Sequence, residues 1–212
     1  AGSIGITSGP ASASSHAVDI TVYGRGGHGS QPHRTLDPIV LGARIVTTLQ
    51  TIVSREVDPL DSAVVTVGSF HAGTKRNIIP DEAKLSLTVR TYKPETRERV
   101  LAAIARIAKG EAAAAGAAEP LVDFSEGGYD MVTNDPALCE RLGVALRRSL
   151  GDERVRKTEP MMGSEDFGVF GAAAGSPSVQ FRVGATNAAL LEDARSQGRL
   201  LLLPAIHSAR FL

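Results

Sequence analysis

Two histidines in a glycine-rich stretch are the first residues of this sequence that could do chemistry. His28 and His33 lie in residues 26–33 (Gly-Gly-His-Gly-Ser-Gln-Pro-His), soon after the alternating run 18–23. The alternation predicts a half-buried strand, and glycines after a strand allow a sharp turn or a close approach to a ligand. A histidine held there can donate a hydrogen bond near neutral pH. A polar turn without a chemical role is the alternative, because short motifs often match by chance.

The last third of the chain holds two more candidate stretches. Glu165 and Asp166 follow Gly163 and Ser164. Ser164 could cap a short helix with both acids in its first turn, where the helix dipole favours them, and a substrate or metal role is the alternative. His207 stands alone near the C-terminus, and its spacing favours a structural role because no second ligand lies three or four residues away.

The segments that must position these residues follow a regular order between residues 17 and 125. After the first strand, the periodicities predict a helix, two strands, a second helix and a last strand, at 36–53, 62–70, 83–91, 94–115 and 121–124. This order is the ferredoxin-like βαββαβ pattern, an antiparallel sheet with both helices on one face. The fold by itself implies no function, although its open face or edge could serve for association.

The chain on either side of this segment has a different character. Residues 1–16 predict one short strand and a connector, and we expect an upstream segment to pair with that strand. From residue 127 onward the sequence predicts a helix at 136–150 and strands at 155–158, 178–183 and 200–203. We therefore divide the chain into a leading segment (1–16), a ferredoxin-like domain (17–125) and a further α/β part (126–212).

Composition excludes several classes of function. The 212 residues carry 23 Lys and Arg against 23 Asp and Glu, so the formal net charge is zero. This balance argues against nucleic-acid binding, which needs a basic excess. No apolar run approaches the ~20 residues that span a bilayer, so we expect no membrane partner. The single cysteine, Cys139, favours a reducing compartment, and hence the cytoplasm.

Five short motifs, taken together, resemble one enzyme family. They are Gly26–His33, Asn77–Asp81, Val89–Thr91, Met162–Phe167 and Pro204-x-x-His207-Ser208, in this order. The set is similar to the metallopeptidases and amidohydrolases that include hippurate hydrolases, aminoacylases and other N-acyl-amino-acid amidohydrolases, and carboxypeptidase G. The Gly-Ser-Glu-Asp-Phe form looks most like the hippurate hydrolase and aminoacylase branch. The resemblance implies an α/β catalytic domain with two divalent metals (zinc, manganese or cobalt) and an inserted ferredoxin-like lid that forms a homodimer.

The resemblance also implies roles for individual residues. His28 would reach a neighbouring active site and stabilise the oxyanion, while Asn77 and Arg90 would bind the carboxylate of an N-acyl amino acid or short peptide. These roles suit the side chains, because arginine holds a carboxylate bidentately and an asparagine amide adds a donor. His207 would ligate a metal. The substrate end of the site would be lined by Gly163, Ser164 and Glu165, with His33 as a further contact.

The sequence departs from the family in its missing parts. The family keeps most metal ligands and its general-base glutamate before the lid, and the given residues hold no His-x-Asp motif and no Glu-Glu pair. One ligand cannot hold a catalytic metal pair, so we expect this polypeptide alone to be inactive on hippurate. Two alternatives stay open: a non-catalytic dimerisation or ligand-binding module, and a dipeptidase or carboxypeptidase of the same superfamily. The polar character of residues 180–182 and 187–199 also departs from the family pattern.

Overall fold

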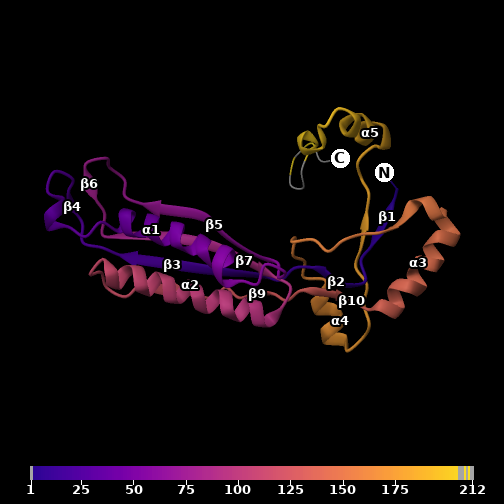
Figure 1. Ribbon diagram of the computed structural model, residues 1–212, viewed down its shortest axis with the longest axis horizontal. Helices are drawn as coiled ribbons and strands as arrows, with labels where there is room; N and C mark the ends of the chain where they lie inside the picture. The colour runs from indigo at the N-terminus through magenta and orange to yellow at the C-terminus, as the bar shows by residue number, and fades with distance from the viewer. Residues whose placement is uncertain (1, 205–207, 209, 211–212) are drawn as a thin grey trace. The chain divides into compact units, whose positions relative to one another are not determined.

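The computed structural model describes residues 2–204, 208 and 210, and it divides into two compact units. We call residues 12–132 with 161–170 the sandwich unit, and residues 1–11, 133–160 and 171–212 the three-stranded unit. Figure 1 shows both units, and each is described by itself. The predicted domain 17–125 falls inside the sandwich unit.

The sandwich unit is built on an antiparallel sheet with the order β5-β7-β3-β8. A short fifth strand, β9 (Gly128–Tyr129), pairs with the beginning of β3. Along the chain the main elements alternate as strand, helix, strand, strand, helix, strand, which confirms the predicted ferredoxin-like fold. Their bounds are β3 (Ser15–Tyr23), α1 (Pro38–Thr51), β5 (Ala63–Ala72), β7 (Glu82–Thr91), α2 (Pro94–Ala114) and β8 (Leu121–Asp123).

The core of this unit lies between the sheet and the two helices. Alternate residues of β3 and β7 are buried, and the residues between them are more exposed, which is the period-2 pattern of a sheet covered on one face. Each fully buried aliphatic side chain stabilises the fold by about 1.5–3 kcal/mol. One apolar cluster joins the sheet to both helices. It contains Val18, Ile20 and Val22 of β3, Leu85, Leu87 and Val89 of β7, Leu41, Ile45 and Leu49 of α1, and Val100, Ile104 and Ile107 of α2.

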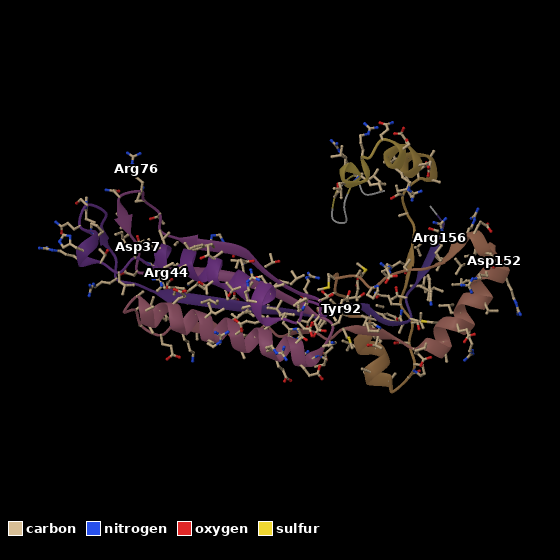
Figure 2. All side chains as sticks on the ribbon, viewed as in Figure 1. Asp37, Arg44, Arg76, Tyr92, Asp152 and Arg156 are labelled. Atoms are coloured by element: carbon tan, nitrogen blue, oxygen red, sulfur yellow. The ribbon has the colours of Figure 1, made fainter. Side chains whose placement is uncertain are left out.

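Helix α1 begins where the sequence indicates. Asp37, labelled in Figure 2, accepts hydrogen bonds at Oδ1 from the backbone N–H of Ile39 (2.9 Å) and Val40 (3.4 Å), and Pro38 occupies the first helical position. The helix ends in one wide turn, the π-helix η2 (Ile52–Glu56), closed by the N–H of Val57 on the carbonyl of Ile52 at 3.0 Å. This turn carries the chain from the helix toward β5.

The three-stranded unit has β1 (Ile4–Ile6) at the centre of its sheet. β11 (Val155–Lys157) is parallel to β1, and β12 (Phe181–Val183) is antiparallel to it on the other side. Both edges of β1 are therefore paired inside this unit, so the expectation of an upstream partner strand is wrong. Helix α3 (Pro136–Leu150) covers one face, where Cys139 packs with Ile4 and Ile6.

Two predictions for the last third need correction. Residues 200–203 are not a strand, because local bonds from Leu202 N–H to Arg199 and from Leu203 N–H to Leu200 turn them into the 3-10 helix η4 (Leu200–Leu202). The strand expected at 178–183 is confined to β12. The polar stretch 187–199 contains helix α5 (Ala188–Ser196), which Asn187 caps through Oδ1.

Four further elements of the described chain are short. They are β2 (Gly9–Ser12), β10 (Val132–Asn134), the 3-10 helix η3 (Asp152–Arg154) and α4 (Gly168–Ala174).

None of the helices in the described part of the chain is long and apolar enough to cross a bilayer.

Candidate functional site

The glycine-rich stretch folds back on a second loop at one end of the sandwich unit. β4 (Gly27–His28) pairs with β6 (Ile78–Ile79), and the N–H of Gly29 donates to the carbonyl of Asn77 at 2.9 Å. The two motifs that carry His28 and Asn77 are thus brought together, although 49 positions separate them in the sequence. Figure 1 shows β4 and β6 side by side at the end of the sheet away from β9.

The glycines of this stretch are needed because the backbone lies so close to them, both at the end of the same loop and in the second loop. A Cβ on Gly24 would lie 2.5 Å from the carbonyl oxygen of Leu36, and one on Gly26 would lie 2.6 Å from that of Ile79. The N–H of Gly26 also donates to Asp81 Oδ1 at 2.8 Å. The glycines therefore allow a close approach to other backbone of the same chain rather than to a ligand. These contacts fix the backbone that carries the His28 side chain.

His28 is exposed, and its ring is held by one neighbour. The backbone N–H of Ser30 donates to His28 Nδ1 at 3.2 Å, and Ser30 Oγ lies 2.7 Å from the same nitrogen. Since a backbone N–H can only donate, Nδ1 is the acceptor, and the neutral ring carries its proton on Nε2. His28 therefore presents an N–H donor outward. His33 lies on the 3-10 helix η1 (Pro32–Arg34) of the same loop and is also exposed.

Arg90 lies near the other end of β7 and is only half-exposed. Its Nη1 donates to the carbonyl oxygen of Met162 at 2.9 Å and to Ser164 Oγ at 3.4 Å. The loop it contacts is held in addition by Ala13, whose N–H donates to the carbonyls of Met161 (3.0 Å) and Gly163 (3.1 Å). The structure thus brings Arg90 together with the predicted Gly163–Ser164 segment, and Glu165 follows as an exposed residue.

Ser164 does not cap a helix. The next helix, α4, begins at Gly168, and both acids precede it. The backbone carbonyl of Asp166, rather than a serine side chain, accepts the N–H of Val169 at 3.0 Å. The capping alternative is therefore wrong, because Ser164 serves as a partner of Arg90 instead.

The predicted residues thus form two groups at opposite ends of one sheet. β3 leaves the sheet at Tyr23, opposite Glu82, just before the loop of His28. Arg90 lies eight positions beyond Glu82 along β7, which at the rise of an antiparallel strand is about 27 Å. No single side chain spans this length. A site that uses both groups would have to combine residues from two copies of the domain.

A polar cluster that the sequence did not single out lies beside β9. His16 Nε2 is 3.5 Å from Arg97 Nη1, and Arg97 forms an ion pair with Asp130. Because arginine only donates, Nε2 accepts and the proton of the neutral ring sits on Nδ1. That nitrogen is buried without a hydrogen-bond partner. Burial lowers the pKa of His16 below its ordinary value, and the positive charge of Arg97 lowers it further. The negative charge of Asp130 acts in the opposite direction but does not offset them.

This lowered pKa predicts that the chain loses stability in mild acid. The unfolded chain takes up a proton near pH 6.5 while folded His16 stays neutral, so the free energy of unfolding falls as the pH drops from 6.5 through the folded pKa. Urea unfolding at pH 7.5 and 5.5 measures the effect. His16→Gln should show a smaller loss than the wild type over this interval, and equal losses would contradict the prediction.

The described residues do not form a metal centre. Within residues 2–204, 208 and 210, no three His, Cys, Asp or Glu side chains gather closely enough to hold a metal ion. His207, the predicted ligand, lies outside the described residues. The described residues therefore do not fit a metal pair by themselves.

Comparison with known proteins places these features in a family. Residues 11–115 match the family described as the M20 peptidase dimerisation domain. The chain is 42% identical over 135 residues to the N-acyl-L-amino acid amidohydrolase of Geobacillus stearothermophilus. This match covers 59% of the chain and 36% of that protein. The chain is 35% identical over 179 residues to thermostable carboxypeptidase 2 of Saccharolobus solfataricus, covering 84% of this chain and 44% of that protein.

A solved structure agrees with the sequence relatives. The Bacillus subtilis YXEP protein, described as a dinuclear metal-binding peptidase of the M20 family, superposes with a TM-score of 0.63 and 28% identity. The match covers 86% of this chain and 44% of that protein, so the chain spans less than half the length of each of these three relatives. Residues 11–115, which lie mainly in the sandwich unit, have the fold of a peptidase dimerisation domain. The chain belongs to the M20 family of amidohydrolases and peptidases, as its five motifs predict.

Proposed function

We propose that this chain works as part of a metal-dependent hydrolase that cleaves the amide bond of N-acyl amino acids. The observation that carries the proposal is the half-buried guanidinium of Arg90, fixed by the carbonyl of Met162 beside Ser164. Those two contacts use one of its terminal nitrogens, which leaves further N–H donors for a substrate carboxylate. An N-acyl amino acid presents such a carboxylate next to its scissile amide.

His28 supplies the second part of the proposal. Amide hydrolysis builds negative charge on the carbonyl oxygen, and a positioned N–H donor stabilises it. The Nε2–H of His28 is such a donor, on a backbone made rigid by close packing at Gly24 and Gly26. Because Arg90 lies at the far end of the sheet, His28 and Asn77 would serve the active site of a second copy. This geometry supports a homodimer formed through the dimerisation domain.

The metals and the remaining site residues belong to the same proposal. Two divalent ions (zinc, manganese or cobalt), when bound by the complete protein, would supply the activated water. His207 would be one ligand, and Gly163, Ser164, Glu165 and His33 would line the substrate. A cytoplasmic location is part of the proposal as well, on the strength of the single cysteine.

A carboxypeptidase or dipeptidase is the second candidate function, and the similarity to thermostable carboxypeptidase 2 favours it. A carboxypeptidase substrate also ends in a carboxylate that Arg90 could hold, so the site described here does not separate the two. A dimerisation module without catalysis is the third alternative. It predicts that the coding sequence upstream lacks a His-x-Asp motif and a Glu-Glu pair.

Substrate assays on the parent protein test the proposal. With zinc or manganese added, we expect release of amino acids from N-acetyl and N-benzoyl amino acids, including hippurate, and slower cleavage of dipeptides. Faster cleavage of dipeptides would favour the peptidase, and no cleavage of either class would favour the module. The 212-residue chain assayed alone should be inactive, and turnover of hippurate by it would contradict the sequence-based prediction.

A further inference from the structure

A cavity of about 330 Å³ lies in the three-stranded unit, between α3 and the strands β1 and β11. Its floor is apolar: Ile6 and Cys139 are 7% and 5% exposed, and Pro136 and Gly143 of α3 complete the wall. The size is at the lower end of the range for small-molecule sites. None of its lining residues takes part in the function proposed above.

The rim of this cavity is charged, mainly with one sign. Arg147 comes from α3, and Arg156 and Lys157 come from β11, against the single carboxylate of Glu140. Figure 2 shows Arg156 on β11. Among the ion pairs found in the described part of the chain, none involves any of these four groups. Among the described residues, the lining of the cavity therefore carries three cations against the one carboxylate of Glu140.

The strand register places one of the cations over the apolar floor. Lys157 pairs with Ile6 across β1 and β11, and paired residues of neighbouring strands point to the same face of a sheet. Arg147 faces the cavity from α3, one turn beyond Gly143. A ligand seated on Ile6 and Cys139 would thus have an ammonium and a guanidinium at its polar end.

We propose that this cavity binds a small organic carboxylate with an apolar body. The body would replace water over Ile6, Pro136 and Cys139, and the carboxylate would accept hydrogen bonds from Lys157 and Arg147. Cys139 acts as an apolar wall here: burial, and then the charge of Asp135, raise the pKa of its thiol, so the thiol stays protonated at neutral pH.

Calorimetric titration with three ligands of one shape tests the proposal. Benzoate should bind saturably, while benzyl alcohol and benzylamine, which lack the negative charge, should bind at least about tenfold more weakly. The double variant Arg147→Gln, Lys157→Gln should lose about tenfold or more in benzoate affinity. Arg148→Gln, the neighbouring cation on α3 that does not line the cavity, should leave the affinity unchanged.

The single cysteine reports where the ligand binds. Benzoate should slow the reaction of Cys139 with a neutral maleimide in the wild type, and it should fail to do so in the double variant. Equal affinities for benzoate and benzyl alcohol, an unchanged affinity in the double variant, no saturable benzoate binding, or no protection of Cys139 would each overturn the proposal. The thermal unfolding midpoint of each variant serves as the control for folding.

Discussion

Replacing His28 by alanine in the parent enzyme is expected to lower kcat by about 10²- to 10³-fold, the usual cost of losing one oxyanion donor. The substrate carboxylate would still be held by Arg90, so KM should change much less. The reason is positional, because the Nε2–H of His28 points outward from a loop fixed by Ser30 and by the close backbone contacts of Gly24 and Gly26. Steady-state kinetics on an N-acyl amino acid measure both constants.

The distance between His28 and Arg90 makes a sharper form of this test available. If each site takes His28 from one copy and Arg90 from the other, mixing the inactive variants His28→Ala and Arg90→Gln creates dimers with one intact site. Statistical exchange makes half of the dimers mixed, so about a quarter of the wild-type activity should return. A matched mixture of His28→Ala with itself should recover nothing. Absence of recovery after proven subunit exchange would contradict the two-copy site.

The sequence predicts the sandwich unit well because local rules and the global fold agree there. Alternating apolar residues in β3 and β7, a 3.6-residue stripe in α2 and an Asp-Pro cap at α1 each specify one structure. Where local rules are weak, the prediction fails. Leu200 to Leu203 have a strand-like composition, yet local bonds turn them into η4. Ser164 fits a capping pattern, yet Arg90, 74 positions away, takes its hydroxyl group as a partner.

Contacts between residues far apart in the sequence also explain why the partners of some polar residues could not be predicted. Arg182 makes its strand more polar than the family pattern, but its Nη2 donates to Thr7 Oγ1 at 2.9 Å and to the carbonyl of Glu159. The sequence places His16 at the end of the connector that precedes the strand at 18–23, and only the approach of α2 and of the segment after β9 surrounds it with Arg97 and Asp130. No spacing rule connects positions 16, 97 and 130.

The candidate site could also be predicted only in part from the sequence. Five motifs predict which residues take part, and the contact of Arg90 with the Met162–Ser164 segment shows that two of those motifs lie together. The separation of His28 from Arg90 needs the sheet register, since both residues belong to the same domain, where His28 follows β3 and Arg90 lies in the neighbouring strand β7. The sequence therefore identifies the participants, while the fold decides that they belong to two groups.

Replacing Ile104 by alanine is expected to cost about 2–5 kcal/mol of the free energy of unfolding. Ile104 is fully buried on α2, in the cluster that joins the helix to β3 and β7. Removing its outer carbons leaves a cavity that a sheet packed on two helices cannot readily close. Urea denaturation followed by circular dichroism measures the loss.

The matched control for Ile104 lies on the same helix. Glu98 is exposed, so Glu98→Ala should change the free energy of unfolding by no more than about 0.5 kcal/mol. Both substitutions place alanine in α2, and the difference between them therefore isolates burial from helix propensity. If Ile104→Ala lowered the free energy of unfolding no more than Glu98→Ala, α2 would not be packed on the sheet as described. The packed sheet that keeps Arg90 apart from the His28 loop would then lack its support.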